Sequence, residues 1–295
     1  MANYTIAFID QTTKDLQSYV WNGTTWSTVG SPLNIAGVNN STLLYIANNL
    51  LVLINNTNKQ LKAYSYSVTS WAQTGLPSGA FSVVGNPCLA SVYPNRFTLC
   101  GDSLQKLIEF DFNGNYFSQV GDQLTLTGNV NPDATGMDLN RIAYIDQNDR
   151  DLTVYDLIGS VWTVVGTPLN IPGAVNASIT AMTKTRVALI DANDEDLKAY
   201  DWNGSTFVLV GNPLNISGIT FPRITAIDVD KVAFFDTTLL KLRVYQFNGS
   251  DWAEVGTEFP IAGATVNPDL SGLYKPFPIT CFNPAPVTPW PVSEV

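Results

Sequence analysis

A short pattern of aromatic residues and glycine recurs six times along this chain at nearly constant spacing. In each copy a Trp or Phe stands four positions before a glycine, and a Tyr or Phe stands eleven positions before it. The glycines are Gly30, Gly75, Gly121, Gly166, Gly211 and Gly256, so successive copies are 45 or 46 residues apart. This period implies a fold of six similar units, because one such unit is too small to bury its apolar face alone.

Each unit contains the residues expected of four short β-strands. In the fifth unit four stretches are rich in β-branched and aromatic residues, and Asn248-Gly249, a strong hairpin signal, separates the last two. The expected strands of this unit are 224–228, 232–236, 242–247 and 252–256. We therefore predict an all-β fold, a six-bladed β-propeller with four-stranded antiparallel blades that each end at the repeated glycine.

The two ends of the chain are expected to complete one blade together. The chain begins inside a second strand, at residues 5–10, with no first strand before it. Residues 267–274 repeat the pattern of residues 131–138, which open another unit. Strand 270–274 is therefore predicted to join the N-terminal blade and close the ring. Residues 1–274 would form the propeller, and residues 275–295 a Pro-rich tail.

Composition excludes several classes of function. The chain has no histidine, which removes Ser-His-Asp and Cys-His catalysis and the commonest metal ligand. A net charge of −10 disfavours nucleic-acid binding and anionic membrane surfaces. The three cysteines are too few for a disulfide framework or a zinc site. Cys88 and Cys100 are close enough in sequence to form a bridge, but buried free thiols are the favoured interpretation.

The N-terminal residues do not resemble a targeting segment. They carry no basic stretch and no long apolar run, and no part of the chain has the length of a membrane span. We therefore expect synthesis in the cytoplasm with no membrane insertion. A protein of this kind that acts outside a cell would leave it by lysis or by a leaderless route.

Candidate binding residues gather in two acidic turns between second and third strands. They are Asp146, Asp149 and Asp151 in one unit and Asp191, Asp194 and Asp196 in the next. A calcium site at Asp191, Asn193 and Asp196 is an alternative, but the central glycine and terminal glutamate of calcium loops are missing. Asp and Asn also stabilise turns through their own side chains. The favoured interpretation is turn chemistry, with no metal and no cofactor.

Catalysis is not supported by any local motif. Glutamates are scarce, although paired carboxylates could in principle hydrolyse a glycosidic bond. Arg96, Arg141 and Arg186 recur at one position of the repeat, which indicates a role in the scaffold. An enzyme tends to break its internal symmetry at one site, and the sequence shows no such break. We therefore predict that the protein is not an enzyme.

The repeats, for example residues 190–204 with 207–211, resemble two groups of proteins. One group is the six-bladed lectins with tryptophan-bearing repeats, such as fungal fucose lectins and tachylectin-like proteins. The other is the leaderless, Asn- and Thr-rich propellers of bacteriophage particles. The lectins hold sugar with Arg, Glu and Trp between blades, and no junction of this chain matches that set. No lectin residue is therefore transferred to this sequence.

The resemblance and the low proportion of charged residues together suggest a function. The leading hypothesis is a non-enzymatic structural or adhesion protein of a virion, displayed on a phage particle to recognise a cell-surface glycan or a neighbouring protein. The alternatives are a stand-alone carbohydrate-binding lectin, cytoplasmic or released, and a glycan-active hydrolase. The tail would attach the ring to other virion proteins, with Pro276, Pro284 and Trp290 as candidate anchoring residues.

Overall fold

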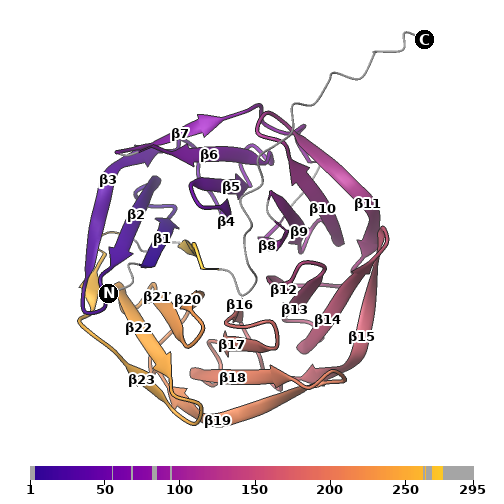
Figure 1. Ribbon diagram of the computed structural model, residues 1–295, viewed down its shortest axis with the longest axis vertical. Coiled ribbons are helices and arrows are strands. Elements are labelled where there is room, and N and C mark those ends of the chain that lie inside the picture. The colour runs from indigo at the N-terminus through magenta and orange to yellow at the C-terminus, as the bar shows by residue number, and fades with distance from the viewer. Residues whose placement is uncertain are drawn as a thin grey trace.

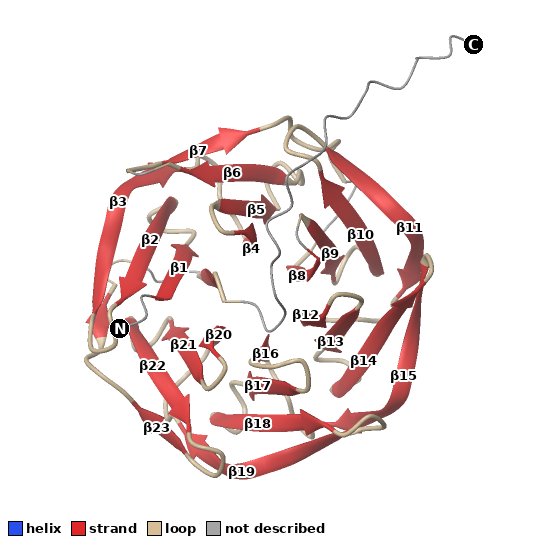
Figure 2. Cartoon of the chain, viewed as in Figure 1, coloured by secondary structure: helices blue, strands red, loops and turns tan. Residues whose placement is uncertain are grey.

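Six antiparallel β-sheets are arranged as blades around one central axis (Figure 1). The computed structural model describes residues 4–54, 56–67, 69–81, 85–93, 95–261, 263 and 268–274. These residues form strands and turns but no helix (Figure 2), and so no helix among them could cross a membrane. The all-β, six-bladed propeller predicted from the repeat is confirmed. The tail residues Pro276, Pro284 and Trp290 lie outside the described residues.

Within each blade the strands lie side by side in order from the axis to the rim (Figure 1). Blade 1 contains β25 (Asp269–Gly272), β1 (Tyr4–Ile9), β2 (Asp15–Trp21) and β3 (Trp26–Asn34), and blade 2 contains β4 (Thr42–Ala47), β5 (Leu50–Ile54), β6 (Lys62–Tyr66) and β7 (Trp71–Thr74). Blade 3 contains β8 (Pro87–Tyr93), β9 (Arg96–Gly101), β10 (Lys106–Phe112) and β11 (Phe117–Thr125), and blade 4 contains β12 (Asp133–Asp138), β13 (Arg141–Ile145), β14 (Asp151–Ile158) and β15 (Val161–Asn170). Blade 5 contains β16 (Ser178–Ala181), β17 (Arg186–Ile190), β18 (Asp196–Trp202) and β19 (Phe207–Asn215), and blade 6 contains β20 (Arg223–Asp228), β21 (Lys231–Asp236), β22 (Lys241–Phe247), β23 (Trp252–Glu254) and β24 (Phe259–Pro260).

The same glycine recurs in every repeat because the backbones of consecutive blades are in contact there. Gly211 has a φ of 68°, and a Cβ on it would lie 2.2 Å from the Ser250 carbonyl oxygen of the next blade. The N–H of Asn212 donates to that same oxygen at 2.6 Å. The equivalent bonds at the other junctions are Ser31–Thr69, Leu76–Asn115, Asp122–Ser160, Thr167–Ser205 and Thr257–Thr24. Only glycine allows this approach of two backbones.

The expectation that each blade ends at its glycine is wrong for four of the outer strands. β3, β11, β15 and β19 continue beyond the glycine and pair again with the third strand of their own blade. In blade 1, Ser18 opposes Val29 and Leu16 opposes Leu33, so the glycine stands in a bulge rather than at a strand end. A bulge bends the outer strand without ending its pairing, and the sequence pattern does not distinguish the two.

The chain ends close the ring as predicted. β25 pairs with β1 in antiparallel register, with Gly272 opposite Ile6 and Asp269 opposite Ile9. The strand ends at Gly272 instead of residue 274, although Leu273 N–H still donates to the Thr5 carbonyl at 3.0 Å. The inner strand of blade 1 therefore comes from the far end of the sequence, while its other three strands come from the N-terminus.

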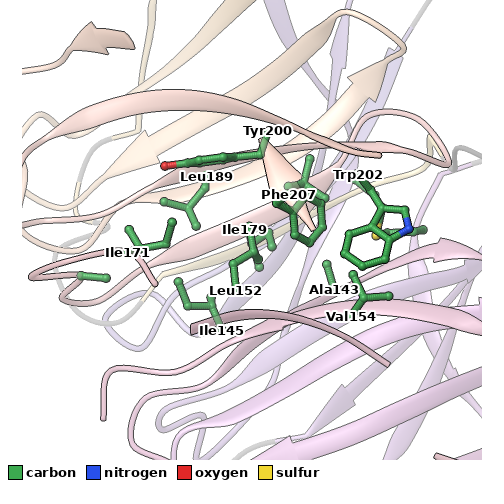
Figure 3. Close-up of a cluster of buried hydrophobic side chains, with 14 residues drawn as sticks. Ala143, Ile145, Leu152, Val154, Ile171, Ile179, Leu189, Tyr200, Trp202 and Phe207 are labelled. Atoms are coloured by element: carbon green, nitrogen blue, oxygen red, sulfur yellow. The ribbon is translucent and has the colours of Figure 1, made fainter. Parts of the chain in front are cut away.

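Aromatic repeats fill the junctions between blades. Figure 3 shows one such cluster, in which Trp202 and Phe207 of blade 5 lie above Ala143 and Val154 of blade 4. All four residues are buried, and the Trp202 and Phe207 ring centroids are 5.3 Å apart. The apolar surface that one blade cannot bury alone is thus covered by its neighbour, and burial of such surface is the main stabilising contribution to the fold.

Two further sequence expectations concern charged and sulfur-containing residues. The repeated arginines form two-point ion pairs within their own blades, such as Arg141 with Asp156 at 2.6 and 2.7 Å, which confirms their scaffold role. The preference for free thiols was wrong, because Cys88 and Cys100 form a disulfide. The two residues are direct partners on β8 and β9, with Cα atoms 5.1 Å apart, a pairing that the sequence spacing alone did not establish.

Candidate ligand-binding crevice

The acidic turns and the crossovers between blades lie on one face of the ring, as the strand order requires. Gln147 N–H donates to the Val130 carbonyl of the preceding crossover at 2.7 Å, and Ile171 N–H donates to the Arg150 carbonyl at 2.7 Å. The turn at residues 146–150 is therefore held between the crossovers on both sides of blade 4.

A crevice of about 280 Å³ opens between blades 3 and 4 on this face. One wall is the end of β11 with the crossover that follows it, and the other wall consists of β13, β14, the acidic turn and two residues of β15. The lining residues are Thr125, Leu126, Thr127, Asn129, Tyr144, Asp146, Asp149, Asp151, Thr153, Tyr155, Val164 and Pro168. Three of the predicted binding residues, Asp146, Asp149 and Asp151, thus line one site.

Two buried polar atoms of this crevice make no well-aligned hydrogen bond within the described residues, although the Tyr144 hydroxyl interacts with the side chains of Asn129 and Asp146. The two atoms are the hydroxyl oxygen of Tyr144 and the side-chain oxygen Oδ1 of Asn129, and both residues are only 3% exposed. The amide nitrogen of Asn129 does donate, to the Gly101 carbonyl at 3.3 Å. A buried polar atom without a well-aligned hydrogen bond is unfavourable, so two such atoms at one crevice favour an occupant that bonds to them.

These two residues break the internal symmetry of the ring. Tyr144 stands 22 positions before its glycine, where the other blades have Phe8, Leu53, Leu99, Leu189 and Phe234. Asn129 stands eight positions after a glycine, where three other crossovers bury Val38, Ala174 and Ile219. The expectation of no symmetry break was therefore wrong. Comparing buried positions across the six repeats would have revealed it, whereas a search for catalytic motifs does not.

The carboxylates of the turn are only partly occupied by turn chemistry. Asp146 Oδ1 accepts the N–H groups of Asn148 and Asp149 at 2.7 and 3.1 Å. Asp149 and Asp151 each use Oδ1, with the side chains of Asn148 and Asn170 as donors. The Oδ2 atoms of Asp149 and Asp151 accept no hydrogen bond from the described residues and remain available as acceptors.

The phenols of the crevice stay neutral at physiological pH. Burial, and next the charge of Asp146, raise the pKa of Tyr144 above its ordinary value. Burial also raises the pKa of Tyr155, together with the charges of Asp146 and Asp149. The Tyr144 and Tyr155 rings meet edge to face, with centroids 6.0 Å apart. The site therefore combines hydrogen-bond donors and acceptors with an aromatic wall.

The second predicted set of residues does not form a site of this kind. Asp191 Oδ1 accepts the N–H groups of Asn193 and Asp194, and Asp194 Oδ2 pairs with Lys198. Asp196 Oδ1 accepts the Asn215 side chain at 3.1 Å. Asp191, Asp194 and Asp196 line neither this crevice nor the cavity on the axis. Within the described residues no three His, Cys, Asp or Glu side chains are grouped to hold a metal ion.

Comparison with known proteins shows the fold. No family model matches the chain, and no curated protein matches its sequence. The structure is similar to a fucose-specific lectin from Aleuria aurantia, with a TM-score of 0.61, 15% identity and coverage of 88% of this chain and 91% of the lectin. It is also similar to a chain of a nidogen–laminin complex, with a TM-score of 0.64, 11% identity and coverage of 92% and 99%.

A third similar structure comes from Bacteroides fragilis and is proposed to be a 6-phosphogluconolactonase. Its TM-score is 0.64 at 9% identity, with coverage of 92% of this chain and 98% of that chain. A lectin, a member of a protein complex and a protein proposed to be an enzyme thus share this architecture. Function must therefore be argued from the site rather than from the fold.

Proposed function

We propose that this protein binds carbohydrate, without catalysis, in the crevice between blades 3 and 4. The observation that carries the proposal is a pair of buried polar atoms without well-aligned hydrogen bonds, Tyr144 Oη and Asn129 Oδ1, beside acceptor oxygens of Asp149 and Asp151. A sugar presents several hydroxyls that both donate and accept, so one ring can satisfy all of these groups. The similarity in fold to a fucose-specific lectin supports the proposal.

The chemistry of the lining suits a neutral sugar. None of the lining residues is Lys or Arg, and three are aspartates. An acidic sugar would therefore bring a negative charge beside carboxylates with no cation to offset it. The ring of Tyr155, which is partly exposed and lines the crevice, provides contact surface for the C–H groups of a sugar ring.

Binding at one small site is expected to be weak for a single chain. A crevice of about 280 Å³ accommodates about one sugar ring, and the symmetry break places it at one junction. Strong attachment to a glycan-covered surface would require several copies of the chain held together, because linked sites gain effective concentration.

A glycan array followed by calorimetric titration tests the proposal. The variant Tyr144→Leu introduces the residue of blades 2, 3 and 5, and Asn129→Val introduces the residue at the equivalent position 38. Both should remain folded and lose binding of the selected sugar by about tenfold or more, the effect of one or two hydrogen bonds. The control Asp194→Asn alters the acidic turn of blade 5 and should bind normally. Full binding by both crevice variants would refute the site.

We also propose that the protein is not an enzyme, although a structural neighbour is proposed to be a lactonase. Incubation of the pure protein with 6-phosphogluconolactone and with polysaccharide should give no hydrolysis above the buffer control. If the wild type hydrolyses a substrate and Tyr144→Leu does not, the crevice is a catalytic site and the proposal is wrong.

Display on a phage particle is the setting we propose for this binding, with the tail attached to other virion proteins. The low proportion of charged residues, 14%, supports it. Detection of the protein in purified particles, and its loss from particles when residues 276–295 are deleted, are the expected results. Particles that keep the truncated protein would show that the tail is not the attachment.

A further inference from the structure

The axis of the ring is surrounded by side chains that stabilise the free edges of the inner strands. An inner strand has no strand partner on its axial side, so its N–H groups need other acceptors. Side-chain oxygens of the neighbouring blade are these acceptors. The Ile179 N–H donates to Asp133 at 2.8 Å, and the Leu43 N–H donates to Asp269 at 2.7 Å. Thr135, Ser178, Thr180, Thr225 and Ser271 act in the same way.

These strands enclose a cavity of about 400 Å³ on the axis. At one mouth a series of asparagine side chains joins four blades. Asn40 donates to Asn86, Asn86 to Asn131, and Asn131 to Asn176. The series and the capping oxygens show that most blades present short polar side chains to the cavity.

Blade 6 departs from this pattern at both positions. Phe221 replaces the asparagine and is 41% exposed, and Arg223 replaces the short capping acceptor. The guanidinium donates from Nη1 to the Pro222 carbonyl at 3.0 Å, and its Nε lies 3.9 Å from Asp269 Oδ1. Its Nη2 donates to none of the described residues. An arginine cannot accept a hydrogen bond, so it gives up the capping role and places donors in the cavity.

Two carboxylates share the cavity with this guanidinium. Asp133 and Asp269 each accept backbone N–H groups but retain lone pairs on a four-site carboxylate. Burial raises the pKa of Asp133 to about 6, while the charge of Arg223 lowers it and that of Asp269 raises it. Burial likewise raises the pKa of Asp269, and the charge of Arg223 lowers it, so the three groups are close enough to interact across the axis.

We propose that the axial cavity binds a small zwitterion, a molecule with one carboxylate and one ammonium group such as an α-amino acid. Arg223 takes the carboxylate, because a guanidinium pairs with it through two parallel N–H groups. Asp133 and Asp269 take the ammonium group. Phe221 contacts the apolar part of the ligand at the mouth.

A ligand with a single charge fits this cavity less well. A lone anion would approach two carboxylates, and a lone amine would leave the guanidinium donors without an acceptor. The volume is within the range of sites for small molecules. This inference is independent of the crevice between blades 3 and 4, because no residue lines both sites.

Calorimetric titration of the full-length protein with three related probes tests the proposal. The probes are L-phenylalanine, phenylacetate and 2-phenylethylamine, which carry both charges, only the carboxylate and only the ammonium. We expect saturable binding of L-phenylalanine, at least about tenfold tighter than either single-charge probe. Absence of binding at millimolar L-phenylalanine, or equal binding of the three probes, would overturn the proposal.

The variant Arg223→Ser supplies a matched test, because serine is the residue of blade 5 at this position and caps a strand there. The variant should show the thermal unfolding of the wild type and lose L-phenylalanine binding by about tenfold. Lys106→Ser removes one positive charge from an outer part of blade 3 and should bind normally. If Arg223→Ser does not fold, Asp133→Asn provides the second variant. Unchanged binding in a folded variant of either residue would also overturn the proposal.

Discussion

Glu109 on β10 should make the stability of the ring depend on pH. Its side chain is 1% exposed, and neither carboxyl oxygen has a hydrogen-bond partner among the described residues. The Nε of Arg96 is 3.5 Å from Oε1, but that arginine is already paired with Asp111. The equivalent positions of the other blades are buried Ser18, Ala63, Val154, Ala199 and Val244. Glu109 is therefore a carboxyl group at a core position.

Burial raises the pKa of Glu109 to about 7 from an ordinary value of 4.5, with Arg96 opposing the change. The folded protein thus keeps a proton that the unfolded chain releases between these two values. The free energy of unfolding must therefore fall as pH rises from about 4.5 to about 7, and stay constant above that with respect to this group. The difference corresponds to about 3 kcal/mol.

Glu109→Gln removes this titration without changing the volume of the side chain. Relative to the wild type, the variant should gain stability as pH rises and be more stable by up to about 3 kcal/mol above pH 7. Urea unfolding at pH 5, 6, 7 and 8 measures the difference, and Glu254→Gln, at an exposed position of β23, is the control. Parallel pH profiles for the wild type and Glu109→Gln would refute the reasoning.

Three further variants test the architecture. Gly211→Ala should lower the free energy of unfolding, measured with urea, by about 3 kcal/mol or more, because the new Cβ would meet the Ser250 carbonyl. The control Gly204→Ala should lower it by about 1 kcal/mol, because a Cβ there meets nothing within 4 Å. A chain of residues 1–262 lacks β25 and should lose cooperative thermal unfolding, while a chain of residues 1–274 keeps it; equal melting curves would contradict ring closure by β25. Replacing both Cys88 and Cys100 by serine should lower stability by about 2–4 kcal/mol, and a reducing agent should destabilise the wild type alone.

Much of the scaffold was predictable because it repeats. Six copies of one glycine and two aromatic positions predicted the blade number, and the copied segment at residues 267–274 predicted the closing strand. The bulges at four of the glycines were missed, because a strand that bends and a strand that ends have the same local sequence. The Cys88–Cys100 pair depended on cross-strand register, which spacing in sequence does not specify.

The candidate sites were predictable only in part. Asp146, Asp149 and Asp151 were identified from their composition, but nothing local distinguished them from Asp191, Asp194 and Asp196. The distinction comes from Tyr144 and Asn129, which leave polar groups and space where other junctions are filled by apolar side chains. Arg223 was missed for the same reason, since its importance depends on what the other five blades place at the axis.

The sequence by itself determined that six equivalent sheets form and that the two ends of the chain meet in one of them, because periodicity is a local property repeated along the chain. Tertiary structure decided which junction is polar, which carboxylates keep unused oxygens and which charges share a cavity. Those properties depend on the neighbours that a side chain acquires from another blade. Ile179, for example, lies 46 residues from Asp133 in sequence, and Leu43 beside Asp269 lies near the opposite end of the chain.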